Sequence, residues 1–177
     1  MLESWQNYFL VITMFKVLKA IKFATDKHNG QTRKVSGEPY VTHPLAVSYI
    51  VASAKVSKHK DDLLCAALLH DVLEDTDATF AEIASMFGPM VATIVFELTN
   101  DQEAIDKIGK LEYHKQKLVG ISSYALVIKL ADRLHNMMDS PTDKMKADTR
   151  SLIEHLEQNR KLSSAHKKLI EQIKETL

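Results

Sequence analysis

Net charge of either sign is absent from this chain. Its 177 residues contain 23 Lys and Arg against 23 Asp and Glu, so the overall charge gives no reason to expect a nucleic acid or an anionic membrane as partner. There is also no basic stripe with interleaved aromatic residues that could bind a phosphate backbone. We therefore expect neither a nucleic acid nor a membrane among its partners.

Cysteine and long hydrophobic runs are nearly absent as well. Cys65 is the single cysteine, which excludes an intrachain disulfide and suits a reducing cytosol. The segment YFLVITMF (8–15) is too short to span a bilayer, and no basic leader or cleavage site flanks it. We expect a cytoplasmic protein in which this segment starts a buried helix and Cys65 is a small buried hydrophobe.

Alternation of apolar and polar residues, the mark of strands, is missing too, and the hydrophobic period is helical throughout. The expected fold is therefore all-α. No repeat, low-complexity tract or linker divides the chain, so we expect a single domain over residues 1–177. Thr79 and Glu82 predict a capping box. The expected helices span residues 6–28 (with Phe15, Leu18, Ile21 and Phe23 on its apolar face), 43–54, 61–75, 80–87, 90–98, 110–118 and 123–138, with two more in 143–176 separated near Ser163-Ser164 and a loop at 29–42; the rest of 99–121 is unassigned.

The stretch LLHDVLEDT (68–76) places four ionisable groups at the end of an apolar run. On one continuous helix, His70 would share a face with Glu74, and Asp71 with Glu74 and Asp75. Burying unpaired carboxylates costs on the order of several kcal/mol, which a divalent cation would offset. Imidazole with carboxylate suits manganese, iron or zinc. The alternative is a surface helix end with solvated acids.

Two residues elsewhere extend this pattern. His43 precedes a proline at the start of an expected helix, and Asp132 lies in the apolar stretch VIKLADRLHNM. Each has a structural alternative, a capping or core histidine for His43 and an internal ion pair, for instance with Lys129, for Asp132. With His70 and Asp71 they form a plausible His-His-Asp-Asp metal site built from three helices.

The order H…HD…D resembles the HD superfamily of metal-dependent phosphohydrolases. The segments HNGQTRKVSGEPYVTHPLAV, AALLHDVLEDT and IKLADRLHNM narrow the resemblance to the hydrolase domain of the RelA/SpoT family, over about residues 20–138. These enzymes remove the 3′-pyrophosphate from the alarmones ppGpp and pppGpp. The resemblance implies an HD-domain helical bundle, one Mn²⁺ ion, and a guanine nucleotide substrate that is hydrolysed to GDP or GTP and pyrophosphate.

The resemblance also implies roles for single residues. The metal ligands would be His43, His70, Asp71 and Asp132; the pair that positions and activates the attacking water would be Glu74 and Asp75; Arg33 and Lys34 would lie beside the guanine base, and Asn136 would contact the nucleotide. Lys129 is a further cation suited to an anionic nucleotide. These roles agree with general chemistry, because a metal lowers the pKa of bound water and a nearby carboxylate can accept its proton.

The chain departs from the long members of that family. The residues after Met138 are too few for their synthetase and regulatory domains, so we expect a stand-alone small alarmone hydrolase. The segment KLEYHKQKL and Asp139 resemble the short, animal forms. Two alternatives stay open: a phosphohydrolase for another nucleotide, such as a phosphatase acting on NADPH, or an HD domain that binds without catalysing. The helices within 143–176 could cover the core or form a dimer surface, which leaves the oligomeric state unknown.

Overall fold

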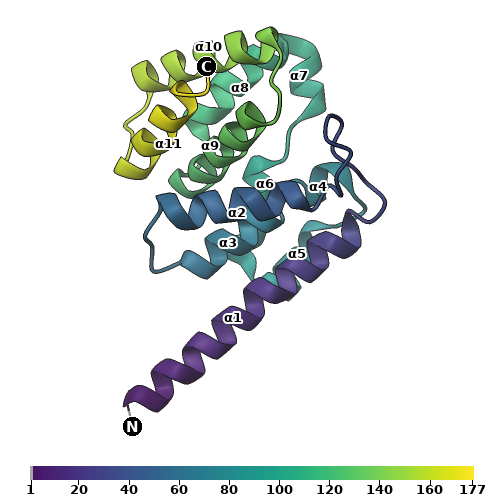
Figure 1. The fold of residues 1–177 in the computed structure, drawn as a ribbon, viewed down its shortest axis with the longest axis vertical. Coiled ribbons are helices and arrows are strands. Elements are labelled where there is room, and N and C mark those ends of the chain that lie inside the picture. The colour runs from purple at the N-terminus through teal and green to yellow at the C-terminus, as the bar shows by residue number, and fades with distance from the viewer. Residues whose placement is uncertain (1) are drawn as a thin grey trace.

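The fold is all-α, as expected. The computed structural model describes residues 2–177, with side chains from Phe15 onward, and in this part of the chain the sole β pairing is an isolated antiparallel bridge between Thr32 and Pro39. Figure 1 shows the helices, which are α1 (Leu2–Lys27), α2 (Thr42–Ala54), α3 (Lys60–Leu68), α4 (Val72–Asp75), α5 (Phe80–Phe87), α6 (Pro89–Leu98), α7 (Gln102–Ile108), α8 (Lys110–Gly120), α9 (Ser123–Met138), α10 (Asp143–Asn159) and α11 (Ser164–Lys174).

Capping side chains set where many of these helices begin. The side chain of Thr79 accepts a hydrogen bond from the backbone N–H of Glu82, and both halves of the expected capping box are present at the start of α5. At the start of α9 the side chain of Ser122 accepts a hydrogen bond from the backbone N–H of Ala125. Between α5 and α6 and between α7 and α8 the chain turns at a single residue, Gly88 (φ 87°) or Gly109 (φ 84°). Glycine takes such a φ without the steric cost that a Cβ would bring.

Helix α9 lies at the centre of the molecule. It packs against α2, α3 and α6 on one side and against α10 and α11 on the other, as Figure 1 shows. Burial of a large aliphatic side chain contributes about 1.5–3 kcal/mol, so contacts on both sides hold this helix firmly. Its buried residues are Ala125, Leu126, Val127, Ile128, Leu130, Ala131, Asp132, Leu134 and Met137. Asp132 is therefore a largely buried carboxylate on a helix that is held firmly from both sides.

The first expected helix is present, but its expected apolar face is partly wrong. Phe23 is buried, whereas Phe15 is 61% exposed and Leu18 is 50% exposed. The predicted burial of the segment 8–15 concerns side chains that, up to residue 14, lie outside the described ones. Periodicity predicts which side of a helix is apolar, but burial also needs a neighbouring element beside each turn.

The expected helix over 61–75 is wrong in one important respect, because it is interrupted. Helix α3 ends at Leu68, a turn follows at residues 69–71, and α4 begins at Val72. The backbone of Leu69 (φ −107°, ψ 7°) and Asp71 (φ −105°, ψ −5°) departs from helical values. In the polar stretch 99–121 the helix expected at 110–118 is confirmed as α8, and α7 is an element that the sequence left unassigned.

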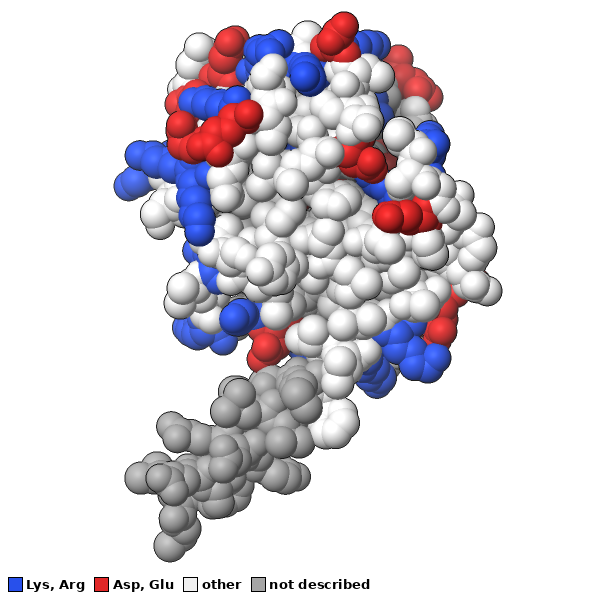
Figure 2. All heavy atoms as spheres, viewed as in Figure 1, with Lys and Arg blue, Asp and Glu red and all other residues white. Residues whose placement is uncertain are grey.

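Three further expectations concern burial and surface. Cys65 is fully buried, and burial raises the pKa of its thiol to about 12, so it is a small hydrophobe as expected. Among the described helices, none combines the length and apolar character needed to cross a bilayer. In Figure 2 the Lys and Arg side chains on the face shown are interspersed with Asp and Glu around its margin, and its middle is uncharged.

Candidate metal centre

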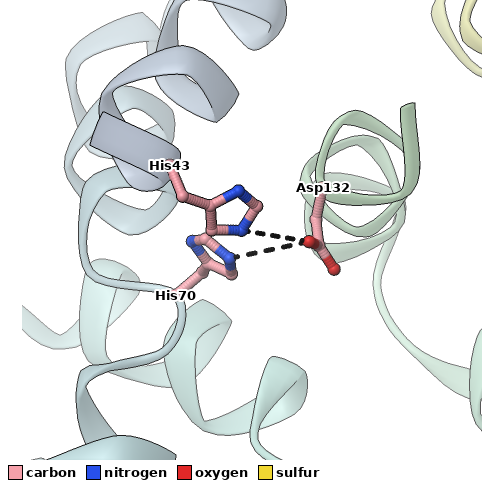
Figure 3. Close-up of side chains that lie close together, drawn as sticks. All are labelled: His43, His70 and Asp132. Carbon is pink, nitrogen blue, oxygen red and sulfur yellow. Dashed lines mark ion pairs between the residues drawn. The ribbon is translucent and has the colours of Figure 1, made fainter. Parts of the chain in front are cut away.

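Three separate segments bring His43, His70 and Asp132 together. His43 lies in the first turn of α2, His70 in the turn after α3, and Asp132 in the middle of α9, as Figure 3 shows. One ligand atom from each lies within 4.8 Å of the other two. The Nε2 atoms of His43 and His70 are 3.2 Å and 4.0 Å from Oδ1 of Asp132. The structure therefore brings together three of the four predicted ligand residues from distant segments, and their binding of a metal stays a prediction.

The interruption after α3 directs two consecutive side chains to this point. Where α3 ends, Nδ1 of His70 lies 2.8 Å from the carbonyl oxygen of Ala67, so the imidazole bonds to the last turn of the helix. The Oδ2 atom of Asp71 then lies 2.9 Å from Nε2 of His70 and 3.8 Å from Nε2 of His43. Asp71 thus lies beside the cluster, although it is outside the mutually close group of three.

Each of the two imidazoles has a hydrogen-bond partner on its outer side, and for His70 this partner fixes the tautomer. A carbonyl oxygen only accepts, so Nδ1 of His70 donates to Ala67 and Nε2 of the neutral ring carries a lone pair. Nδ1 of His43 lies 2.9 Å from Nδ1 of His135. If His43 donates there, its Nε2 also presents a lone pair to the cluster. Backing of this kind by an outer residue is characteristic of metal-binding histidines.

The surroundings of Asp132 favour its charged form. Burial alone would raise the pKa of Asp132, but Lys129 and the two imidazoles hold it well below its usual range. The Nζ atom of Lys129 lies 3.0 Å from Oδ2 of Asp132. The internal ion pair considered as an alternative for Asp132 therefore exists, and it coexists with the histidine cluster because the two use different carboxylate oxygens.

Asp71 and His70 titrate as a pair. Burial opposes ionisation of Asp71, but the adjacent His70 lowers the pKa of this carboxyl group. Burial also lowers the pKa of His70, and Asp71 more than reverses this, raising it to about 8. Without a metal, a proton therefore bridges two groups that would both have to be deprotonated as ligands.

Glu74 and Asp75 have different surroundings. The helix is interrupted at residues 69–71, so the expected continuous face that includes His70 is wrong. Asp71 and Asp75 remain one helical turn apart, since the N–H of Asp75 donates to the carbonyl of Asp71 at 2.9 Å. The carboxylate of Glu74 accepts hydrogen bonds from the backbone N–H (3.2 Å) and side-chain amide (2.9 Å) of Asn100. Burial together with Asp71 and Glu74 raises the pKa of Asp75. The two acids are therefore chemically distinct, one anchored by amide donors and one with increased proton affinity.

These groups lie along a cleft of about 1050 Å³. Arg33 reaches it from the loop between α1 and α2, where its Nη2 donates to Asp139 Oδ2 at 2.7 Å and to Asn136 Oδ1 at 3.0 Å. The side-chain amide of Asn136 in turn donates to Asp132. The residues lining the cleft include every sequence-predicted site residue except the buried His70, together with Tyr40, Asn100, Lys110, His114, Lys115, Arg133, Lys144 and others.

The donor set fits a divalent ion. Atoms bound about 2.1 Å from one ion lie roughly 3–4 Å from each other, and the two imidazole Nε2 atoms lie 3.2 Å and 4.0 Å from Oδ1 of Asp132. When His70 and Asp71 are both deprotonated, the buried Nε2 atom of His70 has no hydrogen-bond donor beside it, and Oδ2 of Asp71 lies 2.9 Å away. A buried lone pair without a donor needs another partner, and a cation between these atoms would supply it.

Sequence reasoning missed two residues of this site. The hydroxyl of Tyr40 donates to Oδ2 of Asp71, and His135 contacts His43. Spacing could have indicated both, since Tyr40 precedes His43 by three residues and His135 follows Asp132 by three on the same helix. Tyr40 is uncharged at neutral pH, so a search for ionisable groups in apolar runs passes over it, and the site expected around Asp132 includes Lys129 and Asn136 but not His135.

The comparisons with known proteins agree with this geometry. Residues 20–161 match the family model of the HD domain. The chain is 39% identical to the guanosine-3′,5′-bis(diphosphate) 3′-pyrophosphohydrolase MESH1 of Drosophila melanogaster over 125 residues, covering 70% of this chain and 69% of that one. It is 38% identical over 144 residues to the bifunctional (p)ppGpp synthase/hydrolase SpoT of Escherichia coli, covering 75% of this chain.

A solved structure is similar over a larger share of the chain. It is that of a metazoan ortholog of SpoT that hydrolyses ppGpp and plays a role in starvation responses, with a TM-score of 0.75 and 32% sequence identity. The match covers 90% of this chain and 94% of that one. By contrast, the chain spans only 19% of the length of Escherichia coli SpoT.

Proposed function

Because this chain belongs to the HD domain family, we propose that it is a metal-dependent hydrolase that removes the 3′-pyrophosphate from ppGpp or pppGpp. The products would be pyrophosphate and GDP or GTP. The observation that carries the proposal is the cluster of two imidazoles and a buried carboxylate beside a cleft of about 1050 Å³, a volume sufficient for a nucleotide. The names of the MESH1 and SpoT relatives support this substrate class.

The HD domain implies a divalent metal, and we propose Mn²⁺ as that ion. His43, His70 and Asp132 would hold it, with Asp71 as the fourth ligand. A bound divalent ion lowers the pKa of water and neutralises charge on phosphate oxygens. Imidazole and carboxylate ligands together suit manganese among the divalent metals.

The acids of α4 would act on the attacking water. We assign proton acceptance to Asp75, since burial and neighbouring negative charge increase its proton affinity. Glu74, anchored by Asn100, would position the water. The water oxygen would form a bond to the phosphorus next to O3′, the bond from that phosphorus to O3′ would break, and O3′ would take up a proton.

The basic residues of the cleft would bind the nucleotide. Arg33 and Lys34 would lie beside the guanine base, and Asn136 would contact the nucleotide from the same side. Asp139 and Asn136 orient the guanidinium of Arg33, which pre-organises it for a planar ligand. Lys129 would keep Asp132 ionised and face the substrate phosphates from the cleft wall. We also propose a cytoplasmic location, supported by the single, buried cysteine.

Product analysis tests the proposal. The protein is incubated with ppGpp and Mn²⁺, with a chelator control, beside the Asp71→Ala variant and an Asp77→Ala control. Asp77 lies in the following loop, where it pairs with Lys27 outside the cleft. We expect GDP and pyrophosphate only with metal and intact Asp71, with helicity unchanged in both variants. No turnover of ppGpp by the folded, metal-loaded protein would refute the proposal, and a nucleotide panel that includes NADPH would then identify the substrate.

A further inference from the structure

The hydroxyl of Tyr40 connects the two acids to which the proposed function gives different roles. It lies within hydrogen-bond distance of Asp71 Oδ2 and 3.4 Å from Asp75 Oδ2. Asp71 belongs to the turn after α3 and Asp75 ends α4. One side chain from the loop between α1 and α2 therefore contacts both acids. Nothing in the family match or in the relatives' names assigns a role to this tyrosine.

The surroundings of Tyr40 hold its ring in place. The ring packs against His28 at a centroid distance of 4.7 Å and against the edge of His43 at 5.8 Å. Its backbone N–H donates to the carbonyl of Gln31 at 2.9 Å, and its carbonyl accepts from the N–H of His43 at 3.0 Å. The loop carrying the ring is thus anchored on both sides of Tyr40, and the hydroxyl has little freedom to leave the two carboxylates.

A second contact ties the same loop to α4. Nδ1 of His28 lies 2.8 Å from Oε1 of Gln31, and the amide nitrogen of Gln31 donates to the backbone carbonyl of Asp75 at 2.9 Å. The loop therefore contacts both the backbone carbonyl of Asp75, through Gln31, and the carboxylate of Asp75, through Tyr40. The position of the hydroxyl relative to these acids follows from several independent contacts.

The chemistry of the contact is that of a fixed donor. Two carboxylates cannot donate to each other when ionised, so the phenol between them is the hydrogen-bond donor. A carboxylate oxygen has two lone pairs, and a hydrogen bond to one of them orients the other. The oxygen of Asp71 that accepts from Tyr40, Oδ2, is also the one that lies 2.9 Å from Nε2 of His70 and 3.8 Å from Nε2 of His43, so the hydrogen bond acts on the carboxylate oxygen nearest the candidate metal position.

We propose that Tyr40 is a positioning residue of the metal centre, whose hydroxyl orients Asp71 for metal binding and sets its place relative to Asp75. The inference rests on the proposed function, since it assumes the roles given there to the two acids. It goes beyond it because it names an uncharged residue, from a different segment, as the group that couples the ligand to the water-activating acid. Loss of an outer-shell partner of this kind costs about 10–100-fold in metal affinity or activity.

The test uses Tyr40→Phe, which removes only the hydroxyl and keeps the ring between His28 and His43. Tyr124→Phe is the matched control, because its hydroxyl lies 3.4 Å from Ser57 Oγ, outside the cleft. The first readout is the dissociation constant of Mn²⁺ from the metal-free protein, which needs no turnover. The second is kcat and KM for ppGpp at saturating Mn²⁺, with unfolding temperature as the check on folding.

For Tyr40→Phe we expect about 10–100-fold weaker Mn²⁺ binding, a lower kcat that saturating Mn²⁺ does not fully restore, and a KM within about twofold of the parent. The residual loss of kcat would report the displaced Asp75, as opposed to incomplete metal loading. Tyr124→Phe should match the parent in each measurement. Parental Mn²⁺ affinity and kcat in Tyr40→Phe would overturn the inference.

A double-mutant cycle separates an effect through Asp71 from a general structural effect. The Mn²⁺ dissociation constants of the parent, Tyr40→Phe, Asp71→Asn and the double variant are compared. If Tyr40 acts through Asp71, its removal weakens binding much less in the Asp71→Asn background. Fully additive losses would refute the inference. If the parent itself neither retains Mn²⁺ nor turns over ppGpp, the proposed function fails first, so the two failures are distinguishable.

Discussion

Replacing Lys129 with methionine tests the electrostatic account of the site most directly. The ammonium group lies 3.0 Å from Oδ2 of Asp132, and both side chains are largely buried. At that distance the Coulomb attraction is about 5.5 kcal/mol for an effective dielectric constant of about 20. Removing one partner of a buried pair leaves the other charge uncompensated and costs about 3–5 kcal/mol. Methionine retains most of the aliphatic volume, so the loss is chiefly electrostatic.

The direction of the Lys129 pKa shift shows that the ion pair with Asp132 contributes to stability at neutral pH. Burial lowers the pKa of Lys129, but the carboxylates of Asp132 and Asp71 more than reverse this and raise it above 10.5. A raised lysine pKa contributes stability below the ordinary pKa, and this stability is lost only as the pH rises past the folded value. The pair is therefore fully present at pH 7.

The assay is thermal and urea unfolding of the metal-free protein, followed by titration with Mn²⁺. We expect Lys129→Met to unfold roughly 6–20 °C below the parent, from the usual 2–4 °C per kcal/mol for a domain of this size. Added Mn²⁺ should narrow the gap, because a ligand that binds only the folded state stabilises it and the ion supplies the positive charge that Lys129 gave to Asp132.

A matched control separates this effect from the general loss of a lysine. Lys115 lines the same cleft and has no ion pair among the described residues, so Lys115→Met should shift the unfolding temperature by no more than about 2 °C. Equal stability of Lys129→Met and the parent in chelator would refute the reasoning. So would a gap that Mn²⁺ widens.

Three further predictions concern other parts of the chain. Burial and the cations Lys129 and Arg133 lower the pKa of His114 to about 4, so the contribution of this group to stability is complete above pH 6.5 and is lost as the pH falls towards 4. The urea midpoints at pH 7 and pH 5 should therefore differ less in His114→Gln than in the parent. An unchanged difference would contradict the lowered pKa. Thr79→Ala removes the capping box of α5 and should cost about 1 kcal/mol in urea unfolding, whereas the exposed Thr93→Ala on α6 should cost no more than about 0.5 kcal/mol. Arg33→Ala should raise KM for ppGpp about tenfold or more and leave Mn²⁺ affinity within about twofold, because the guanidinium is worth on the order of 1.5–3 kcal/mol as a charged hydrogen-bond donor; a fall in kcat alone would contradict its place beside the base.

Much of the fold was predictable because the chain is locally consistent. The helix expected at 123–138 has the observed bounds of α9, since its apolar period, its Ser122 cap and its buried environment all favour the same structure. Helix α7 escaped prediction because its few apolar side chains leave no clear periodicity, and none of its residues is buried. Exposure of Phe15 and Leu18 depends on which elements lie beside α1, and the local sequence does not contain that information.

The candidate site was predictable as a set of residues and less so as a geometry. His43, His70 and Asp132 were identifiable because ionisable groups in apolar runs require compensation. Their actual spacing depends on the interruption after α3, which helical periodicity did not reveal because Leu68, Leu69 and Val72 continue the apolar pattern. The roles of Tyr40 and His135 depend on contacts between segments far apart in the chain, and such contacts follow from the tertiary structure.

The turn at residues 69–71 has a consequence for transplanting the HD pair into another protein. Adjacent side chains on a regular α-helix diverge by about 100° around its axis, so a histidine and an aspartate placed side by side on an ideal helix point to different faces. Here helix α3 ends at Leu68, just before the pair, and Nε2 of His70 and Oδ2 of Asp71 lie 2.9 Å apart. A design that copies this pair would therefore need the end of the helix as well as the two residue types. Substitutions that extend the helix through residues 69–71 should move the two side chains apart without replacing either of them.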